Sequence, residues 1–95
     1  MMERASITVD SVPAIPRHVI FRFDAVRDAW VLLAPERALM PDDIAVEILK
    51  RCDGQRAVSD IVALLAAEFD APPAEIAADV TALLQSLADK GYLSA

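Results

Sequence analysis

The stretch ILKRCDGQRAVSDIV, residues 48–62, decides the fold, because two helical patterns meet in it within a few residues. The first pattern ends at Asp53-Gly54, where a glycine supplies the left-handed conformation that ends many helices. A short polar turn follows, and Ser59 is placed to cap a second helix by accepting its first backbone N–H groups. Helix, turn and helix in this order are typical of DNA-binding proteins, but the same layout also serves as a scaffold for other functions.

On both sides of this turn the apolar residues recur with the helical period. Upstream, Asp42 or Asp43 can cap a first helix. The apolar face of that helix carries Ile44, Ile48, Leu49 and Cys52. The second helix has a broad apolar stripe, made by Ile61, Val62, Leu64, Leu65 and Phe69. A third helix begins near Pro73, whose missing N–H costs nothing in a first turn, and ends before Gly91.

The residues before these helices have the period of strands. Val19, Phe21 and Phe23 alternate with His18, Ile20, Arg22 and Asp24, which is the period of a strand with one buried face. AWVLLA at residues 29–34 supplies a second β-prone run. The polar DAVRD between them suits a hairpin loop. ERALM, residues 36–40, is placed as a short third strand between Pro35 and Pro41. The order predicts an α+β domain, with a three-stranded antiparallel sheet followed by a three-helix bundle of the winged helix-turn-helix type.

The N-terminal residues show no usable period, and two prolines keep their backbone extended. We therefore expect residues 1–16 to form a flexible arm or linker that is dispensable, and residues 17–95 to form the domain. The start of the chain has no apolar run like that of a secretory signal, and no apolar run approaches the ~20 residues that span a bilayer. We expect a cytoplasmic protein that does not bind membranes.

The net charge of −6 argues against a nucleic-acid partner. A DNA-binding domain normally has a basic face that displaces counterions from phosphates. In a winged helix the third helix would enter the major groove, but here it carries Glu75, Asp79 and Asp89 against a single Lys90 at its end. Phosphates would repel such a helix, so we expect no nucleic acid to bind.

The chain also lacks the residue groups that catalysis or metal binding would need. Metal sites need several ligands at short spacing, but Cys52 is the only cysteine and His18 the only histidine. With no base or electropositive pocket in view, Cys52 is better explained as a small buried apolar residue. Only two glycines occur, so there is no Gly-rich phosphate loop. We expect no enzyme activity, no cofactor and no metal.

A binding module remains. A small sheet beside a helical bundle leaves an edge strand with unpaired N–H and C=O groups, and proteins use such edges to capture an extended peptide. Residues 36–40 would be that edge, next to the first helix. The competing interpretation is that Leu39 and Met40 are ordinary core residues, and the periodicity alone favours it.

Three blocks of the sequence go further, because their order and spacing resemble the PqqD family of pyrroloquinoline quinone biosynthesis, after which the RiPP recognition elements are grouped. The blocks are LAPER at residues 33–37, ILKRCDGQRAVSDIV at residues 48–62 and DKGYL at residues 89–93. The resemblance spans residues 18–93. It implies the same sheet and bundle, with a winged-helix topology that does not bind DNA.

The resemblance also implies a function. Members of this family act as peptide chaperones that bind the ribosomal precursor PqqA and present it to PqqE, a radical S-adenosylmethionine enzyme. Some members are fused to PqqC, so a fused or associated PqqC is a further implied partner. In related recognition elements the leader peptide adds a strand against the third strand, beside the third helix. Carried over to this sequence, the binding residues would be Arg37, Ala38, Leu39, Met40 and Pro41 on one wall, and Val80, Leu83, Leu84 and Leu87 on the other.

Two other functions stay open from the sequence. One is a transcriptional regulator with a winged-helix fold, against which the acidic third helix argues. The other is a dimerisation module without a peptide ligand, because an exposed strand edge can also pair with its own copy.

Overall fold

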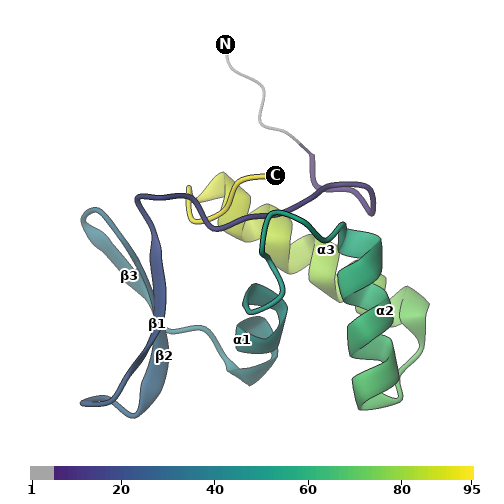
Figure 1. Cartoon of the computed structure of the whole chain (residues 1–95), viewed down its shortest axis with the longest axis horizontal. Helices are drawn as coiled ribbons and strands as arrows, with labels where there is room; N and C mark the ends of the chain where they lie inside the picture. The colour runs from purple at the N-terminus through teal and green to yellow at the C-terminus, as the bar shows by residue number, and fades with distance from the viewer. Residues whose placement is uncertain (1–5) are drawn as a thin grey trace.

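A computed structural model of the chain describes residues 6–95. The strands are β1 (Ile20–Asp24), β2 (Ala29–Ala34) and β3 (Arg37–Leu39), and the helices are α1 (Asp43–Leu49), α2 (Val58–Phe69) and α3 (Pro73–Asp89). The sheet forms one end of the molecule and the pair of α2 and α3 the other, with α1 between them (Figure 1). The predicted α+β fold, three antiparallel strands followed by three helices, is confirmed.

The sheet is built around β2, which pairs antiparallel with β1 on one side and with β3 on the other. β2 and β3 are joined by a two-residue turn, Pro35 and Glu36. Glu36 has a φ of 64°, the positive value that the third position of a type II turn requires. This tight turn fixes the register of β3, so the strand is held at the edge of the sheet although only three of its residues pair.

The helix starts agree with the sequence at α1 but not at α2. The Asp42 carboxylate accepts the Ala45 N–H at 2.8 Å, as predicted for a capping residue. α2 has Ala57 in the capping position, and the Asp60 carboxylate accepts the Ala57 N–H at 3.2 Å. The prediction that Ser59 caps this helix is wrong, since Ser59 lies inside the first turn.

Residues 7–16 explain why α2 needs no serine cap. They form a segment without helix or strand, the N-terminal strap, which bends at a turn where the Ser11 N–H donates to the Thr8 carbonyl at 3.1 Å. The strap crosses the domain above α1 and α2 (purple in Figure 1). The Val58 N–H donates to the Ser11 carbonyl at 2.8 Å, and the Ser59 N–H donates to the Val9 carbonyl at 2.9 Å. These bonds satisfy N–H groups of the first helical turn, which have no partner inside the helix.

The N-terminal strap is packed as well as hydrogen-bonded. Ile7 is buried, and its N–H donates to Gln85 Oε1 of α3 at 2.7 Å. Pro13 is buried too, and its carbonyl accepts the Gly54 N–H at 3.0 Å. The strap therefore joins α3 to the turn that follows α1.

The prediction of a flexible arm is therefore wrong for residues 7–16. Beyond the contacts above, Ala14 exchanges two backbone hydrogen bonds with Ser94, at 2.8 and 2.9 Å. Because the strap pairs with partners distant in sequence and belongs to no regular sheet, its residues show no period. Residues 1–5, the rest of the predicted arm, lie outside the described residues.

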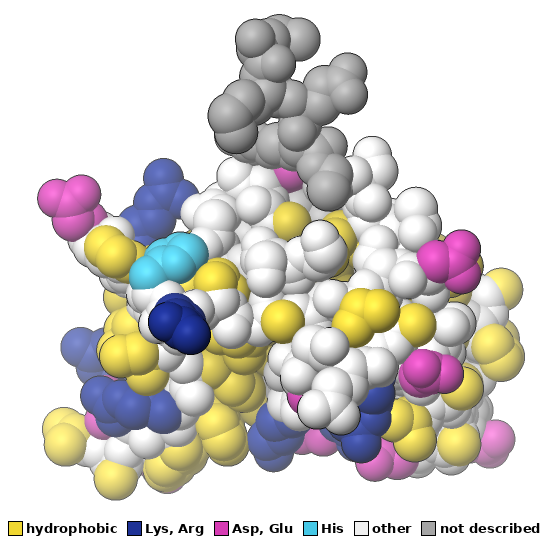
Figure 2. Space-filling model, turned by 45° about the horizontal axis from the view of Figure 1, so that its top comes forward, with side chains coloured by type: hydrophobic (Ala, Val, Ile, Leu, Met, Phe, Trp, Pro, Cys, Tyr) yellow, Lys and Arg dark blue, Asp and Glu magenta, His cyan; other side chains and the backbone are white. Residues whose placement is uncertain are grey.

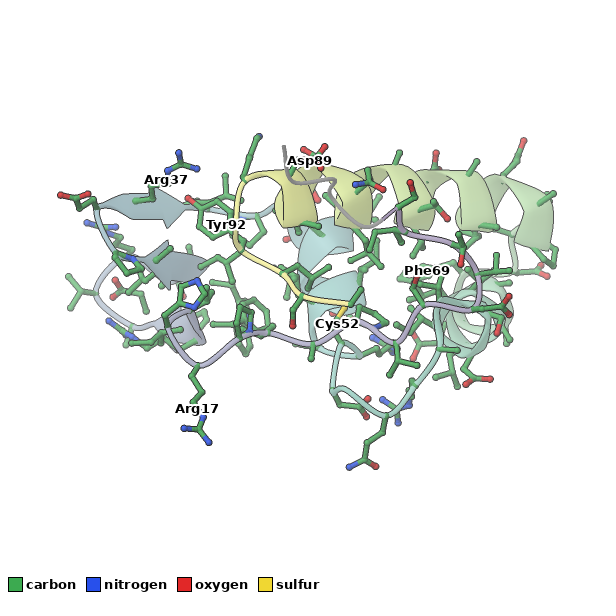
Figure 3. All side chains as sticks on the ribbon, turned by 90° about the horizontal axis from the view of Figure 1, so that it is seen from above. Arg17, Arg37, Cys52, Phe69, Asp89 and Tyr92 are labelled. Atoms are coloured by element: carbon green, nitrogen blue, oxygen red, sulfur yellow. The ribbon has the colours of Figure 1, made fainter. Side chains whose placement is uncertain are left out.

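The core lies between the inner face of the sheet and the three helices. Its most enclosed side chains come from every layer: Leu32, Ile48, Leu49, Val58, Ile61, Val80 and Leu84. After Gly91, which has a φ of 85° as a residue that ends a helix often does, the chain turns back. Tyr92 and Leu93 are then buried in the core, as the sequence indicates. The C-terminal tail runs back from Tyr92 toward Cys52 (Figure 3).

Candidate peptide-binding site

β3 lies at the edge of the sheet, and no strand among residues 6–95 pairs with its outer side. Arg37 Nη1 donates to the Lys90 carbonyl at 2.9 Å. This bond ties the start of β3 to the C-terminal end of α3, where the last carbonyls lack a partner within the helix. The Leu39 side chain is half-buried against the core. The predicted proximity of β3 and α3 is therefore present at this end of the helix.

The backbone of β3 alternates between groups that bond to β2 and groups that face outward. Ala34 and Arg37 flank the two-residue turn, where the closing pair is hydrogen-bonded. Because hydrogen-bonded and non-hydrogen-bonded pairs alternate, Leu33–Ala38 is a pair without such bonds. The N–H and C=O of Ala38 thus point away from β2, while those of Leu39 point toward it. Ala38 is the position within β3 with its backbone groups open to a ligand.

The five residues predicted for the first wall form a continuous, largely exposed edge. Arg37, Ala38 and Met40 are exposed, with Met40 at 57%, whereas Leu39 and Pro41 are half-buried. Leu39 packs inward, so the interpretation as a core residue holds for its side chain. Met40 projects into solvent, and that interpretation is wrong for it.

The second predicted wall, on α3, differs from the sequence interpretation. Val80, Leu84 and Leu87 are core residues, with exposed fractions of 1%, 0% and 3%. Leu83 is half-buried and packs against the core from its edge. Leu84 and Leu87 therefore offer no surface to a ligand, and Leu83 is the leucine of this set that keeps some. An apolar stripe marks the buried side of a helix, but its rim cannot be separated from its centre by period alone.

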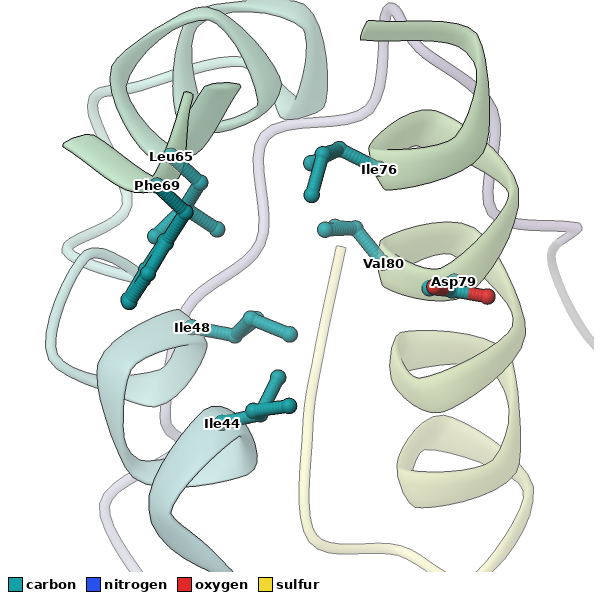
Figure 4. Close-up of a pocket in the computed structure, with 7 residues that line it drawn as sticks. All are labelled: Ile44, Ile48, Leu65, Phe69, Ile76, Asp79 and Val80. Atoms are coloured by element: carbon teal, nitrogen blue, oxygen red, sulfur yellow. The ribbon is translucent and has the colours of Figure 1, made fainter. Parts of the chain in front are cut away.

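A cavity of about 240 Å³ opens between α1, α2 and α3 (Figure 4). We call it the interhelical pocket. Its wall is apolar except for one carboxylate, and it consists of Ile44, Ile48, Leu65, Phe69, Ile76, Asp79 and Val80. In Figure 4 the side chains of Ile44 and Ile48 from α1 face those of Ile76 and Val80 from α3. Phe69 hangs from the end of α2 on the α1 side of the opening.

The sequence interpretation missed this pocket. It placed Ile44 on the same buried face as Ile48, yet Ile44 is 66% exposed and Phe69 is 54% exposed. The pairs Ile44–Ile48 and Ile76–Val80 each lie one helical turn apart, which is a signal that each pair shares a face. That spacing does not show that α1 and α3 leave a cavity between these two faces.

A second, more open hollow of about 320 Å³ adjoins α1 and shares Ile44 and Phe69 with the first. The Trp30 ring of β2 forms part of its wall, and Lys50 Nζ lies 5.0 Å from the centre of that ring. Trp30 in turn stacks on Phe21, with 4.8 Å between ring centroids. The exposed side of α1 is therefore bordered by apolar surface on both flanks.

The charges near the interhelical pocket are not equally balanced. Arg51 bridges α1 and α2, with Nη1 3.2 Å from Glu47 Oε1 and Nη2 2.6 Å from Glu68 Oε1. The hydrogen bond from Arg51, helped by Lys50, lowers the pKa of Glu47 below the usual glutamate range. Asp79, at the pocket, forms an ion pair with no residue of the range 6–95. It is thus the uncompensated charge of the pocket wall.

The same imbalance extends over the molecule. Residues 41–95 carry ten Asp and Glu against four Lys and Arg, whereas residues 17–40 carry three against four. Figure 2 shows most of the acidic side chains of that face over the helical half on the right, with Lys and Arg gathered on the left and at the lower middle. The helical half therefore attracts cations more than anions.

Cys52 lies in the core and is unsuited to nucleophilic chemistry. Its Sγ donates to the Ile48 carbonyl at 3.3 Å. Burial, with the negative charge of Asp53, raises the pKa of the Cys52 thiol to about 12. The thiol therefore stays protonated at neutral pH, and the predicted buried position is confirmed. Among residues 6–95, no three His, Cys, Asp or Glu side chains are grouped as metal ligands would be, and none of the helices is long and apolar enough to cross a bilayer.

Comparisons with known proteins agree with this architecture. The family model of coenzyme PQQ synthesis protein D (PqqD) matches residues 29–93. A relative from Rhodopseudomonas palustris (strain BisB5), named PqqA binding protein, is 58% identical to this chain over 95 residues, covering 98% of this chain and 93% of the relative.

Two solved structures are similar as well. One is the solution NMR structure of the PqqD truncation of Methylobacterium extorquens PqqCD, described as a functional and stand-alone RiPP recognition element. It is 46% identical, covers 99% of this chain and 100% of its own, and superposes with a TM-score of 0.83. The other, a crystal structure of PqqD from Xanthomonas campestris, is 45% identical, covers 94% and 99%, and has a TM-score of 0.61. The chain belongs to the PqqD family.

Proposed function

We propose that this protein is a peptide chaperone that binds the precursor peptide PqqA by strand addition along β3. The observation that carries the proposal is the open backbone of Ala38 at the edge of the sheet. An extended peptide would pair with these groups, gaining main-chain hydrogen bonds that depend little on its sequence. The name of the Rhodopseudomonas palustris relative supports PqqA as the peptide.

The edge is suited to a ligand and poorly protected against one. Natural edge strands are usually blunted by inward-pointing charges, bulges or a covering segment. The one charged side chain of β3, Arg37, is turned to the Lys90 carbonyl. Ala38 is small and exposed, so an incoming strand would meet no bulky side chain there.

The proline substitution Ala38→Pro tests the strand addition directly. Proline removes the outward N–H of Ala38, and edge strands tolerate proline at such positions. Binding of PqqA should weaken by at least about tenfold in Ala38→Pro, the factor that corresponds to one good hydrogen bond. The matched control, Ala38→Ser, keeps the N–H and should bind like the unchanged chain. Equal affinity of the two variants would refute strand addition at β3.

The amide chemical shifts on adding PqqA give an independent map. Shifts should concentrate in residues 36–41 and on the exposed rim of α3, and they should spare the turn at residues 53–59. A map centred on that turn or on the hairpin loop at residues 24–28 would move the peptide to another face.

The role implied by the family resemblance extends to partners. In this proposal the protein acts in the cytoplasm as a binding protein without catalysis of its own, presents PqqA to PqqE, and works beside PqqC. Sedimentation of PqqE with this protein should show a larger complex when PqqA is present. If the larger complex also forms with Ala38→Pro, this protein binds PqqE independently of its binding to the peptide.

A further inference from the structure

The interhelical pocket has enough volume to hold an apolar group the size of a benzene ring. A dry apolar cavity of about 150 Å³ is enough to take up benzene, and this pocket has about 240 Å³. All of its lining residues but Asp79 are apolar. Transfer of an apolar group from water into such a pocket is favourable, because apolar surface is removed from water on both sides. A group as large as an aromatic ring or a branched aliphatic side chain fits its volume.

The rim of the pocket carries apolar side chains that remain exposed to solvent. Ile44 is 66% and Phe69 54% exposed, although both stand beside a core that could have enclosed them. A side chain entering the pocket would cover parts of both residues.

The pocket lies close to the strand edge along the chain. α1 follows β3 after only three residues, and Ile44 is in the first turn of α1. The five peptide units from Leu39 to Ile44 span no more than roughly 18 Å. A peptide paired with β3 can therefore place a side chain in the pocket with only a few more residues of its own length.

The charge beside the pocket favours a cationic neighbour. Asp79 is exposed, lines the pocket, and has no ion-pair partner among residues 6–95. The adjoining hollow adds Asp43, while its Lys50 is paired with its Glu47 at 3.4 Å. An anionic group would be repelled here, whereas a Lys, an Arg or a free amine would be attracted.

We infer that the interhelical pocket receives one large apolar side chain of the bound peptide, and that Asp79 selects a cationic group next to it. The inference rests on the proposed function and names the peptide feature that the domain reads. The strand edge would supply affinity through the backbone, and the pocket would supply specificity.

Three ligands with the same indole ring test the pocket without any peptide. Tryptamine is cationic, indole is neutral and indole-3-acetate is anionic. In amide titrations of the full chain at low salt, all three should shift Ile44, Phe69 and Ile76. Tryptamine should bind about threefold to tenfold more tightly than indole-3-acetate, the range expected for exposed charges. Shifts elsewhere on the surface, or the reverse order of affinity, would overturn the inference.

The variant Asp79→Asn isolates the charge in the same experiment. It keeps the shape of the side chain, so indole should bind as before. The difference between tryptamine and indole-3-acetate should shrink toward none. A difference that persists in Asp79→Asn would show that the selection comes from other groups.

The peptide itself tests whether the pocket belongs to the peptide site. Ile44→Ser removes exposed apolar surface at the pocket, and Leu64→Ser removes apolar surface at a 43% exposed position of α2 outside the pocket lining. PqqA should bind about tenfold more weakly to Ile44→Ser, and unchanged to Leu64→Ser. Equal binding of both variants would overturn the inference while leaving strand addition at β3 intact. Failure of the unchanged chain to bind PqqA would instead refute the proposed function, and the indole series would still report on the pocket.

Discussion

The N-terminal strap and β3 are both short segments outside the helices, but they use their backbone groups in different ways. The strap gives the carbonyls of Val9, Ser11 and Pro13 to N–H groups of α2 and of the turn before it. β3 bonds to β2 on one side and leaves the N–H and C=O of Ala38 facing outward. The strap uses these carbonyls within its own domain, whereas β3 is open on one side.

The difference separates structural backbone from binding backbone. A buried polar group without a partner is costly, so the strap satisfies helix ends that would otherwise need caps or water. An exposed edge is satisfied by water, which a peptide strand can replace at little cost. Backbone groups that bond within the domain stabilise the fold, whereas the outward groups of Ala38 can take a ligand.

Removing the strap should produce the largest effect. A chain that starts at Arg17 loses the buried Ile7 and Pro13 and several backbone hydrogen bonds, so its free energy of unfolding should fall by about 3–5 kcal/mol. Urea denaturation of both chains measures this. Within the full chain, Ile7→Ala should cost about 2–3 kcal/mol, whereas Val9→Ala, at a 47% exposed side chain, should cost less than about 0.5 kcal/mol. An unchanged urea midpoint after the deletion would show that the strap is dispensable for stability, as predicted from the sequence.

A proline at Leu39 should produce the next largest effect. The N–H of Leu39 points toward β2, so Leu39→Pro removes a bond of the sheet and disturbs a side chain that packs on the core. We expect a loss of about 2–3 kcal/mol in the free energy of unfolding. Ala38→Pro, one residue earlier, should change stability little and act on peptide binding instead. If the two prolines had the reverse effects, the alternation along β3 would be shifted by one residue.

An alanine at Gly54 should test the contact between the strap and the turn after α1. Gly54 has a φ of +77°, and a Cβ there would lie 3.3 Å from the Ala14 Cβ. Gly91→Ala is the matched control, because its φ is +85° but its Cβ would meet no atom within 4 Å. Both should lose about 1 kcal/mol or more from the left-handed backbone, and Gly54→Ala should lose a few tenths more. If Gly91→Ala loses more free energy of unfolding than Gly54→Ala, the strap can move away from the new Cβ at Ala14 with little cost.

The sequence predicts those parts of the fold whose residues repeat with a period. The hairpin, the three helices, the cap at Asp42 and the helix-ending Gly91 follow from local patterns, and the structure contains all of them. The edge at residues 37–40 was predictable as well, because a short strand between two prolines ends a small sheet.

What could not be predicted depends on contacts between distant segments. The strap binds through single residues to α2, α3 and Ser94, and nothing within residues 7–16 encodes those partners. On α3 the apolar stripe does not reveal that Leu84 is enclosed while Leu83 sits at the rim. The exposure of Ile44 depends on how far α1 stands from α3, which is a property of packing and not of sequence period.

Acid should have the smallest effect, acting at the turn that receives the strap. The Asp53 carboxylate accepts the N–H groups of Arg56 and Gln55, both at 2.9 Å, and these bonds, the one from Arg56 first, lower its pKa below the usual aspartate range. A carboxyl whose pKa is lower in the folded state stabilises the fold above its unfolded pKa, and the contribution is lost as the pH falls through the folded pKa. Asp53→Asn should therefore be slightly less stable than the unchanged chain at neutral pH. The difference should disappear as the pH falls below about 4, the range in which aspartate takes up a proton. Urea midpoints measured from pH 7 to pH 3 check this, and a gap that widens in acid would mean that the Asp53 carboxylate is not what holds the turn against the strap.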